Sequence, residues 1–288
     1  MNFTKLHGAG NDYVLIEAGN RQQDWPRLAI EVCDRHYGIG ADSLLVLLPS
    51  DKAEFGMRIF DADGSEAEAC GNGIRCLTRY VFERGLIPAR TNRISVETIA
   101  GVRNLKLSRK ENQLIGIQAG MGKPEFGADN IPVSIKQGEG KVVDIKSMLS
   151  YSVIIDGIEV NLNLVSMGNP HAVYFWDRPV DEFPLPQIGP KVEKLAIFPN
   201  RTNFEVARVI NRRQVELRTW ERGVGETLAC GSGACAVTVA AQLYGYVDSK
   251  VEVKVKGGVL QVEWDGYGEV QLEGPAKIVF TGEWPERV

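Results

Sequence analysis

The strongest constraint on the fold is a five-residue segment that occurs twice. Residues 69–73 read ACGNG, and residues 229–233, 160 positions later, read ACGSG. In each copy a cysteine, Cys70 or Cys230, stands before an apolar run with helical spacing, which predicts a helix beginning at the glycines. Further pairs share this offset or nearly so: Arg58 and Arg218, Phe60 and Trp220, Asp61 and Glu221, and Asn11 and Asn169. Matches spread over ~90 residues predict two structurally equivalent halves.

The secondary-structure signals have the same order in both halves. We expect central helices near 72–84 and 232–244, and a shorter helix after Asp24 that buries Cys33. Strands are expected in the first half at 3–7, 13–17, 44–48, 57–60, 93–99, 103–109 and 113–119. In the second half they are expected at 151–155, 158–166, after 171, and at 204–210, 214–220, 250–256, 259–264, 269–273 and 276–281, while 177–200 has helical spacing only at 192–195. Glycine, proline and charge at 120–150 indicate a domain boundary.

Composition excludes several classes of partner. The formal net charge is -4 and no block of lysine and arginine occurs, so nucleic acid is not an expected partner. The N-terminus lacks the apolar core of a signal peptide, and no apolar run approaches the ~20 residues that span a bilayer. We therefore expect a cytoplasmic protein that does not contact membranes. Five cysteines, an odd number spread over 288 residues, predict free thiols.

The two cysteine turns suggest proton chemistry at carbon. Unpaired N–H groups at a helix N-terminus stabilise an anion, so they are expected to lower a thiol pKa from about 8.5 and to hold a carboxylate beside the sulfur. Two such turns around one molecule would supply a base and an acid on opposite faces of one carbon, without a cofactor. A zinc site is disfavoured because Cys70 and Cys76 lie too far apart in sequence for the usual spacing, and Cys230 and Cys235 are at its limit. Cys76 and Cys235 are expected to pack inside the helices.

The residues resemble the diaminopimelate epimerase family. The matching segments are 5–13 (KLHGAGNDY), 35–42 (RHYGIGAD), 63–76 (DGSEAEACGNGIRC), 167–171 (MGNPH), Asn203 and 220–236 (WERGVGETLACGSGACA). The resemblance implies an α+β fold of two pseudo-symmetric domains, each a curved antiparallel sheet or barrel around a central helix. It implies domains of 1–119 with the C-terminal strand 275–288, and of 120–274, with the active site in the cleft between them.

The resemblance also implies a reaction and a set of residues. The reaction is epimerisation of LL-2,6-diaminopimelate to the meso form, without cofactor or metal, in lysine and peptidoglycan synthesis. Cys70 and Cys230 would be the two bases, and His171 and Glu221 would help to ionise them. The substrate would be bound by Asn11, Ser43, Asp61, Gly71, Asn72, Asn169, Asn203, Arg222, Gly231 and Ser232. Asp61 and Ser43 depart from the family pattern, which has Asn and Gln there in many members, and an extra acid would repel a dicarboxylate unless Asp61 turns to an ammonium group or an arginine.

Two alternatives stay open at this point. One is a related racemase or epimerase that acts without pyridoxal phosphate on proline, hydroxyproline or histidine. The other is a redox switch in which Cys70 and Cys230 form a reversible disulfide. The family resemblance further suggests a homodimer.

Overall fold

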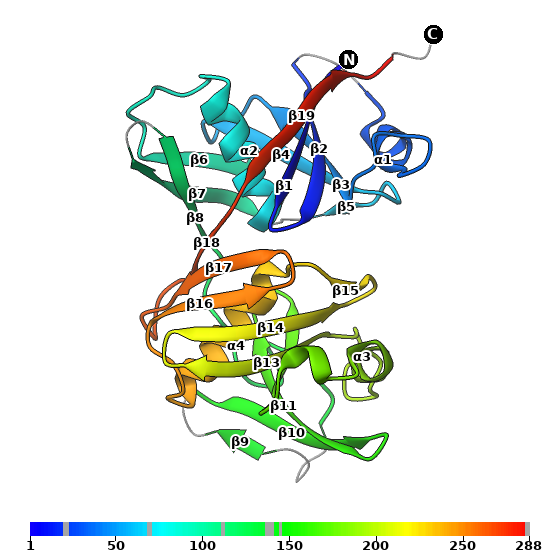
Figure 1. Cartoon of the computed structure of the whole chain (residues 1–288), viewed down its shortest axis with the longest axis vertical. Helices are drawn as coiled ribbons and strands as arrows, with labels where there is room; N and C mark the ends of the chain where they lie inside the picture. The colour runs from blue at the N-terminus through cyan, green and yellow to red at the C-terminus, as the bar shows by residue number, and fades with distance from the viewer. Residues whose placement is uncertain (20–22, 68–70, 111–112, 136–140, 144–145, 286–288) are drawn as a thin grey trace. The chain divides into compact units, whose positions relative to one another are not determined.

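The computed structural model describes residues 1–19, 23–67, 71–110, 113–135, 141–143 and 146–285. The chain divides into two compact units, one formed by Met1–Gly120 with Glu273–Val288 and the other by Met121–Leu272. Strands dominate both units, and each unit holds one long α-helix and one short one (Figure 1). No helix in the described part of the chain is long and apolar enough to cross a membrane.

The first unit has the predicted strands and helices. Its elements are β1 (Asn2–Gly8), β2 (Asn11–Glu17), α1 (Trp25–Cys33), β3 (Ser43–Leu48), β4 (Phe55–Asp61), β5 (Glu66–Ala67), α2 (Gly71–Glu83), β6 (Arg93–Thr98), β7 (Gly101–Lys110), β8 (Gln113–Gly120) and β19 (Lys277–Glu283). Asp24 caps α1 by accepting a hydrogen bond from the Arg27 N–H at 3.2 Å, and Cys33 is buried, as predicted.

The second unit repeats this order. Its elements are β9 (Lys141–Val143), β10 (Met148–Ile155), β11 (Ile158–Ser166), β12 (Pro170–Phe175), the 3₁₀ turn η1 (Val180–Glu182), α3 (Leu185–Glu193), β13 (Asn203–Asn211), β14 (Gln214–Glu221), β15 (Gly225–Thr227), α4 (Gly231–Leu243), β16 (Lys250–Val255) and β17 (Gly258–Glu263). Strand β18 (Gln271–Gly274) begins in the second unit and ends in the first. The hairpin between β10 and β11 turns at Asp156 and Gly157, both with positive φ, as the sequence predicts.

Strand pairing confirms the duplication. In the first unit β1–β2 is antiparallel, β2–β3 parallel, β3–β4 antiparallel and β4–β6 parallel. The pairs β11–β12, β12–β13, β13–β14 and β14–β16 follow the same sequence of directions. The offset read from the sequence is therefore an offset between equivalent strands and helices.

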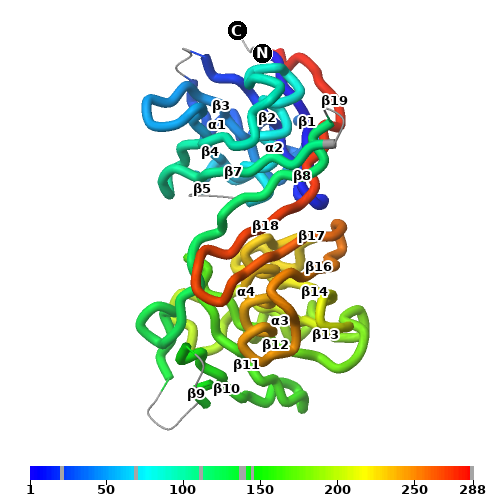
Figure 2. Tube along the Cα trace, turned by 90° about the vertical axis from the view of Figure 1, so that its left-hand side faces the viewer, coloured from blue at the N-terminus to red at the C-terminus, as the bar shows by residue number. Residues whose placement is uncertain are grey.

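The outer edge of each sheet is completed differently. In the second unit β10 pairs with β11 and precedes it in the chain. In the first unit the equivalent neighbour of β1 is β19, with Asn2 opposite Glu283. β19 lies beside β1 in Figure 1, and Figure 2 shows the same pair from the side. The first unit is thus closed by a strand from the far end of the chain.

Each sheet carries helices on both faces. In β3, Leu45 and Leu47 belong to the core around α2, while Leu44 and Val46 belong to the core against α1. This two-sided burial explains why β3 is apolar throughout. In the second unit Phe204 and Val206 of β13 pack in the core that includes α3. Asn203 and Glu205 alternate with them, so they point to the opposite face, where α4 packs on β13.

The helix predicted at 192–195 is misplaced. Helix α3 spans Leu185–Glu193, with Pro186 in its first turn and Pro190 inside it. The prolines conceal the helix in the sequence, although Leu185, Ile188 and Val192 form its buried stripe. The short strands β5, β9 and β15 were not predicted either, because segments of two or three residues have no periodicity.

Candidate active site

Cys230 is the N-cap residue of α4. Its Sγ accepts a hydrogen bond from the Gly233 N–H at 3.4 Å and lies 3.5 Å from the Ser232 Oγ. Gly231 is the first residue of the helix, and Cys230 is only 6% exposed. The second cysteine turn therefore has the predicted geometry, with the sulfur at the positive end of a 13-residue helix.

The charge state of Cys230 differs from the prediction. Burial raises its pKa well above the ordinary value, and the Glu221 and Glu205 carboxyls raise it further. The hydrogen bonds from Ser232 and Gly233 oppose this rise without reversing it. The expected lowering of the pKa is therefore wrong for this cysteine, because desolvation outweighs the helix N-terminus. Cys230 is a thiol at neutral pH.

Glu221 lies at the end of β14 beside this thiol. Its Oε1 accepts a hydrogen bond from the Thr227 hydroxyl at 2.5 Å, and its side chain is also hydrogen-bonded to Cys230. Burial raises the pKa of Glu221, and the Glu205 carboxyl adds to the rise. The carboxyl is therefore placed to exchange a proton with the thiol.

His171 forms a fully buried pair with Glu205. The His171 Nδ1 lies 2.7 Å from the Glu205 Oε1, and its Nε2 lies 2.9 Å from the Asn169 Oδ1. Both side chains of the pair have no exposed surface. The structure thus brings together His171, Asn169, Glu221 and Cys230 in the second unit. Sequence reasoning missed Glu205, although its position two residues after Asn203 places both on one face of a strand.

Asn203 and Arg222 belong to the same end of this sheet. The Asn203 Nδ2 donates to the Pro170 carbonyl at 2.9 Å, and its Oδ1 accepts from the Arg222 backbone N–H at 2.9 Å. The Arg222 guanidinium donates to the Asn200 carbonyl at 3.3 Å. Asn203 therefore ties β12 to the turn that carries Arg222.

The first unit holds an asparagine in the equivalent place. Asn11 donates through Nδ2 to the Asp42 Oδ2 at 2.7 Å, while its Oδ1 accepts from the Tyr13 hydroxyl and, at 3.3 Å, from the Asn72 Nδ2. Asn72 in turn accepts from the Arg75 Nη2 at 2.5 Å. The structure thus links Asn11 to the start of α2.

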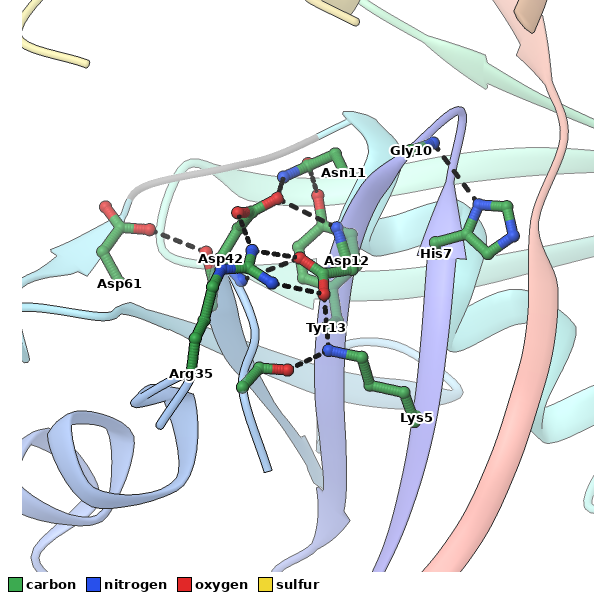
Figure 3. A network of polar contacts seen from close by, with 11 residues as sticks. Lys5, His7, Gly10, Asn11, Asp12, Tyr13, Arg35, Asp42 and Asp61 are labelled. Carbon is green, nitrogen blue, oxygen red and sulfur yellow. Dashed lines mark hydrogen bonds and ion pairs between the residues drawn. The ribbon is translucent and has the colours of Figure 1, made fainter. Parts of the chain in front are cut away.

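Charged side chains hold Asn11 in position (Figure 3). The Arg35 Nη2 donates to the Asp12 Oδ1 at 2.8 Å and to the Asp42 Oδ1 at 2.7 Å. The Lys5 Nζ donates to the Asp12 Oδ2 at 2.5 Å. These residues come from the segments 5–13 and 35–42, which explains two sequence motifs that bear no catalytic side chain.

Ser43 and Asp61 face each other on neighbouring strands. The Ser43 hydroxyl donates to the Asp61 Oδ1 at 2.8 Å. Burial raises the pKa of Asp61, and Asp63 and Asp42 raise it further. Among the described side chains, the hydrogen bond of Asp61 goes to this serine rather than to the arginine considered in the sequence analysis.

Cys70 lies outside the described residues, and Gly71 begins α2 directly after it. Among the described residues, no three histidine, cysteine, aspartate or glutamate side chains lie together as metal ligands.

Comparisons with known proteins agree over the whole chain. A family model described as diaminopimelate epimerase matches residues 3–127 and 163–279. A protein named diaminopimelate epimerase from Acetivibrio thermocellus is 46% identical over 285 residues, covering 98% of each chain. Another of the same name, from Pelotomaculum thermopropionicum, is 43% identical and covers 100% of both chains.

Solved structures share the fold at low sequence identity. A phenazine biosynthesis protein of the PhzF family from Bacillus anthracis superposes with a TM-score of 0.71, at 16% identity over 99% of both chains. A hydroxyproline epimerase from Agrobacterium vitis gives a TM-score of 0.68 at 14% identity, over 98% of this chain and 91% of that one. These likenesses establish the two-unit α+β fold.

Proposed function

We propose that this chain, which belongs to the diaminopimelate epimerase family, is an isomerase that interconverts LL-2,6-diaminopimelate and the meso form in lysine and peptidoglycan synthesis. The observation that carries the proposal is the identity of 42–46% to proteins of that name over nearly the full length of this chain. The buried thiol at the start of α4 supplies the acid such a reaction needs.

Cys230 acts as the proton donor of the resting enzyme. Burial keeps it a thiol, and Glu221 is hydrogen-bonded to it. When the α-carbon takes the proton from Cys230, the resulting thiolate is stabilised by the Gly233 N–H and the Ser232 hydroxyl. In the reverse direction the same thiolate removes the proton.

Cys70 is the partner base on the other face of the carbon. The proposed two-base reaction requires it to be a thiolate while Cys230 is a thiol, with the states exchanged after each turnover. The α-carboxylate is held by backbone N–H groups of Gly231 and Ser232 and by the Gly71 and Asn72 end of α2. No cofactor takes part in this scheme.

The remaining site residues recognise the rest of the substrate. Arg222 binds the distal carboxylate, because a guanidinium can grip a carboxylate with two hydrogen bonds. Asn203 supports this contact by holding the Arg222 backbone. Asn11 and Asn169 bind polar groups near the reacting carbon, and the Ser43–Asp61 pair faces the distal ammonium. The expected homodimer and cytoplasmic location stay predictions, which sedimentation and cell fractionation would test.

Substitution of the cysteines tests the mechanism. The Cys230→Ala and Cys70→Ala variants each lack one of the two groups that transfer the proton. The rate of epimerisation is expected to fall by at least about 10²–10⁴-fold in each. The measurement is α-deuteration of LL-diaminopimelate in D2O followed by NMR. The matched control is Cys235→Ala on the same helix, fully buried and one turn further, which should keep the activity.

Each outcome separates the candidate functions. Near-normal turnover in either single variant would exclude the two-base mechanism. Wild-type protein that exchanges the α-proton of hydroxyproline or proline, but not of diaminopimelate, would assign the chain to a related racemase. Reduced protein that exchanges no amino acid would favour a thiol redox switch.

A further inference from the structure

The carboxyl of Glu205 is a buried group that the proposed mechanism does not use. Glu205 lies on β13 with no exposed surface, and its Oε1 contacts the His171 Nδ1 at 2.7 Å. Among the described residues its Oε2 has no hydrogen-bond partner, although the Ala172 backbone N–H helps to lower the pKa of the carboxyl against the rise that burial causes. Leaving a buried carboxyl oxygen without a partner is costly, so the group needs a physical explanation.

Two further titratable groups lie near the pair of His171 and Glu205. The Cys230 thiol comes from the start of α4 and the Glu221 carboxyl from β14. A Cβ atom added at Gly233 would lie 2.8 Å from the Glu205 Oε1 and 3.3 Å from the Cys230 Sγ. The Glu205 carboxyl therefore lies against the first turn of α4, near Glu221. A negative charge on Glu205 without a compensating positive charge would be strongly unfavourable there.

The hydrogen bonds of His171 determine how many protons the pair holds. The Asn169 Oδ1 accepts hydrogen bonds and cannot donate, so the His171 Nε2 facing it at 2.9 Å carries a proton. The contact between Nδ1 and the Glu205 Oε1 requires one more proton, on either atom. The pair then holds two protons and has no net charge.

The first unit has different residues at the positions equivalent to His171 and Glu205. Tyr13 lies opposite Ser43 as His171 lies opposite Asn203, and the Tyr13 hydroxyl donates to the Asn11 Oδ1. Two residues along the neighbouring strand, the position of Glu205 is occupied by the buried Leu45. A phenol is a donor at any pH below about 10, whereas a neutral imidazole donates from only one nitrogen. Only the histidine therefore needs a carboxyl hydrogen-bonded to its other ring nitrogen in order to act as a donor to the asparagine.

We propose that Glu205 is a positioning residue that keeps a proton on the His171 Nε2, so that Asn169 presents its amide N–H groups to the substrate. Glu205 touches no substrate atom and acts through His171. The inference rests on the proposed function, in which Asn169 binds a polar group of diaminopimelate; the amide N–H groups suit its α-carboxylate.

Three variants of the full chain test the proposal. Glu205→Leu removes the partner of Nδ1, so the KM for LL-diaminopimelate should rise about tenfold or more, the factor that corresponds to 1.4 kcal/mol. Glu205→Gln can donate from its amide to Nδ1, so the rise in KM should be much smaller. The double variant His171→Tyr with Glu205→Leu copies Tyr13 and Leu45 of the first unit, so its KM should return most of the way to the wild-type value, while its kcat should fall because His171 no longer assists the thiols.

The pattern of KM values decides the outcome. A purely structural role for Glu205 predicts equal damage in the Gln and Leu variants and no recovery in the double variant, and either result would overturn the proposal. An unchanged KM in Glu205→Leu would overturn it as well. Thermal unfolding of each variant shows whether it is folded.

A measurement on the unsubstituted protein makes the test independent of folding. NMR of protein with ¹⁵N-labelled histidine, of which the chain has three, should show His171 with a proton on Nε2. An unprotonated Nε2 at neutral pH overturns the proposal even if epimerisation is normal. Failure of the wild type to exchange the α-proton of diaminopimelate would instead overturn the proposed function and leave the NMR result valid.

Discussion

Each half of the chain carries the same arginine–glutamate pair, in different surroundings. The Arg58 Nε and Nη2 donate to Glu66 at 2.5 and 2.8 Å, and those of Arg218 donate to Glu226 at 2.8 and 3.1 Å. The Arg58 side chain is 40% exposed, whereas that of Arg218 is 7% exposed and also donates to two backbone carbonyls. The same two-point contact is therefore at the surface in one half and in the interior in the other.

The two halves also differ at the positions of His171 and Glu205. The pair Tyr13 and Leu45 contains no group that titrates near neutral pH, while the equivalent His171 and Glu205 hold a buried proton network. The duplicated fold keeps its scaffolding contacts in both halves, while a fully buried histidine–glutamate pair occurs, among the described residues, only in the second. Similar halves can therefore hold different buried groups at equivalent positions.

The largest effect on stability is expected at the arginines. Arg218→Ala leaves the two backbone carbonyls without their donor, while Glu226 keeps Lys256 at 2.7 Å, so we expect a loss of about 2–5 kcal/mol in the free energy of unfolding. Arg58→Ala breaks a half-exposed pair and should cost less than about 1 kcal/mol. Urea unfolding of both variants measures the difference. Equal losses would show that the two pairs are energetically equivalent despite their burial.

A smaller effect is expected at Asp12, whose equivalent in the second half is Pro170. Burial alone would raise the pKa of Asp12, but hydrogen bonds from Arg35 and Lys5 lower it to about 2. A lowered folded-state pKa stabilises the fold above the unfolded value and loses this contribution as the pH falls toward 2. The contribution should be on the order of 1–2 kcal/mol after allowance for solvent around the 55% exposed Arg35.

The test for Asp12 is the pH dependence of unfolding. Urea unfolding between about pH 5 and 2 should show a smaller acid-induced loss in Asp12→Asn than in the wild type, because the variant lacks the group that titrates. If the free energy of unfolding falls with pH equally in the wild type and the variant, Asp12 does not make the expected contribution to stability.

The smallest effect is expected at two matched threonines. Thr78 and Thr238 are both fully buried, and each donates to the carbonyl four residues earlier, at 2.8 Å to Ile74 and 2.9 Å to Ala234. Each Thr→Val change should alter the stability by no more than about 1 kcal/mol, and by similar amounts. Thermal unfolding measures both variants. A difference in stability of more than about 1 kcal/mol between them would mean that the two threonines do not contribute equally to α2 and α4.

The sequence predicts the duplicated scaffold well, because the spacing of apolar residues and the glycine turns are signals carried by short segments. It does not reveal Glu205, because a single carboxyl in a strand usually faces solvent, whereas all residues from Asn203 to Ala207 are buried. Nor does it predict that Cys230 is a thiol. The helix N-terminus can be read from the sequence, but the desolvation that outweighs it depends on residues brought together by the fold.

The pairing of β19 with β1 sets the order in which a growing chain can fold. Ala276 and Ile278 pack in the core around α2, and the Met1 amino group donates to the Trp284 carbonyl at 2.7 Å. During synthesis the second unit, which ends at Leu272, can therefore be complete while the first still lacks an edge strand. Proteolysis of a released chain that ends after residue 272 should cleave the first half and spare the second. The half that leaves the ribosome first is the last to become resistant.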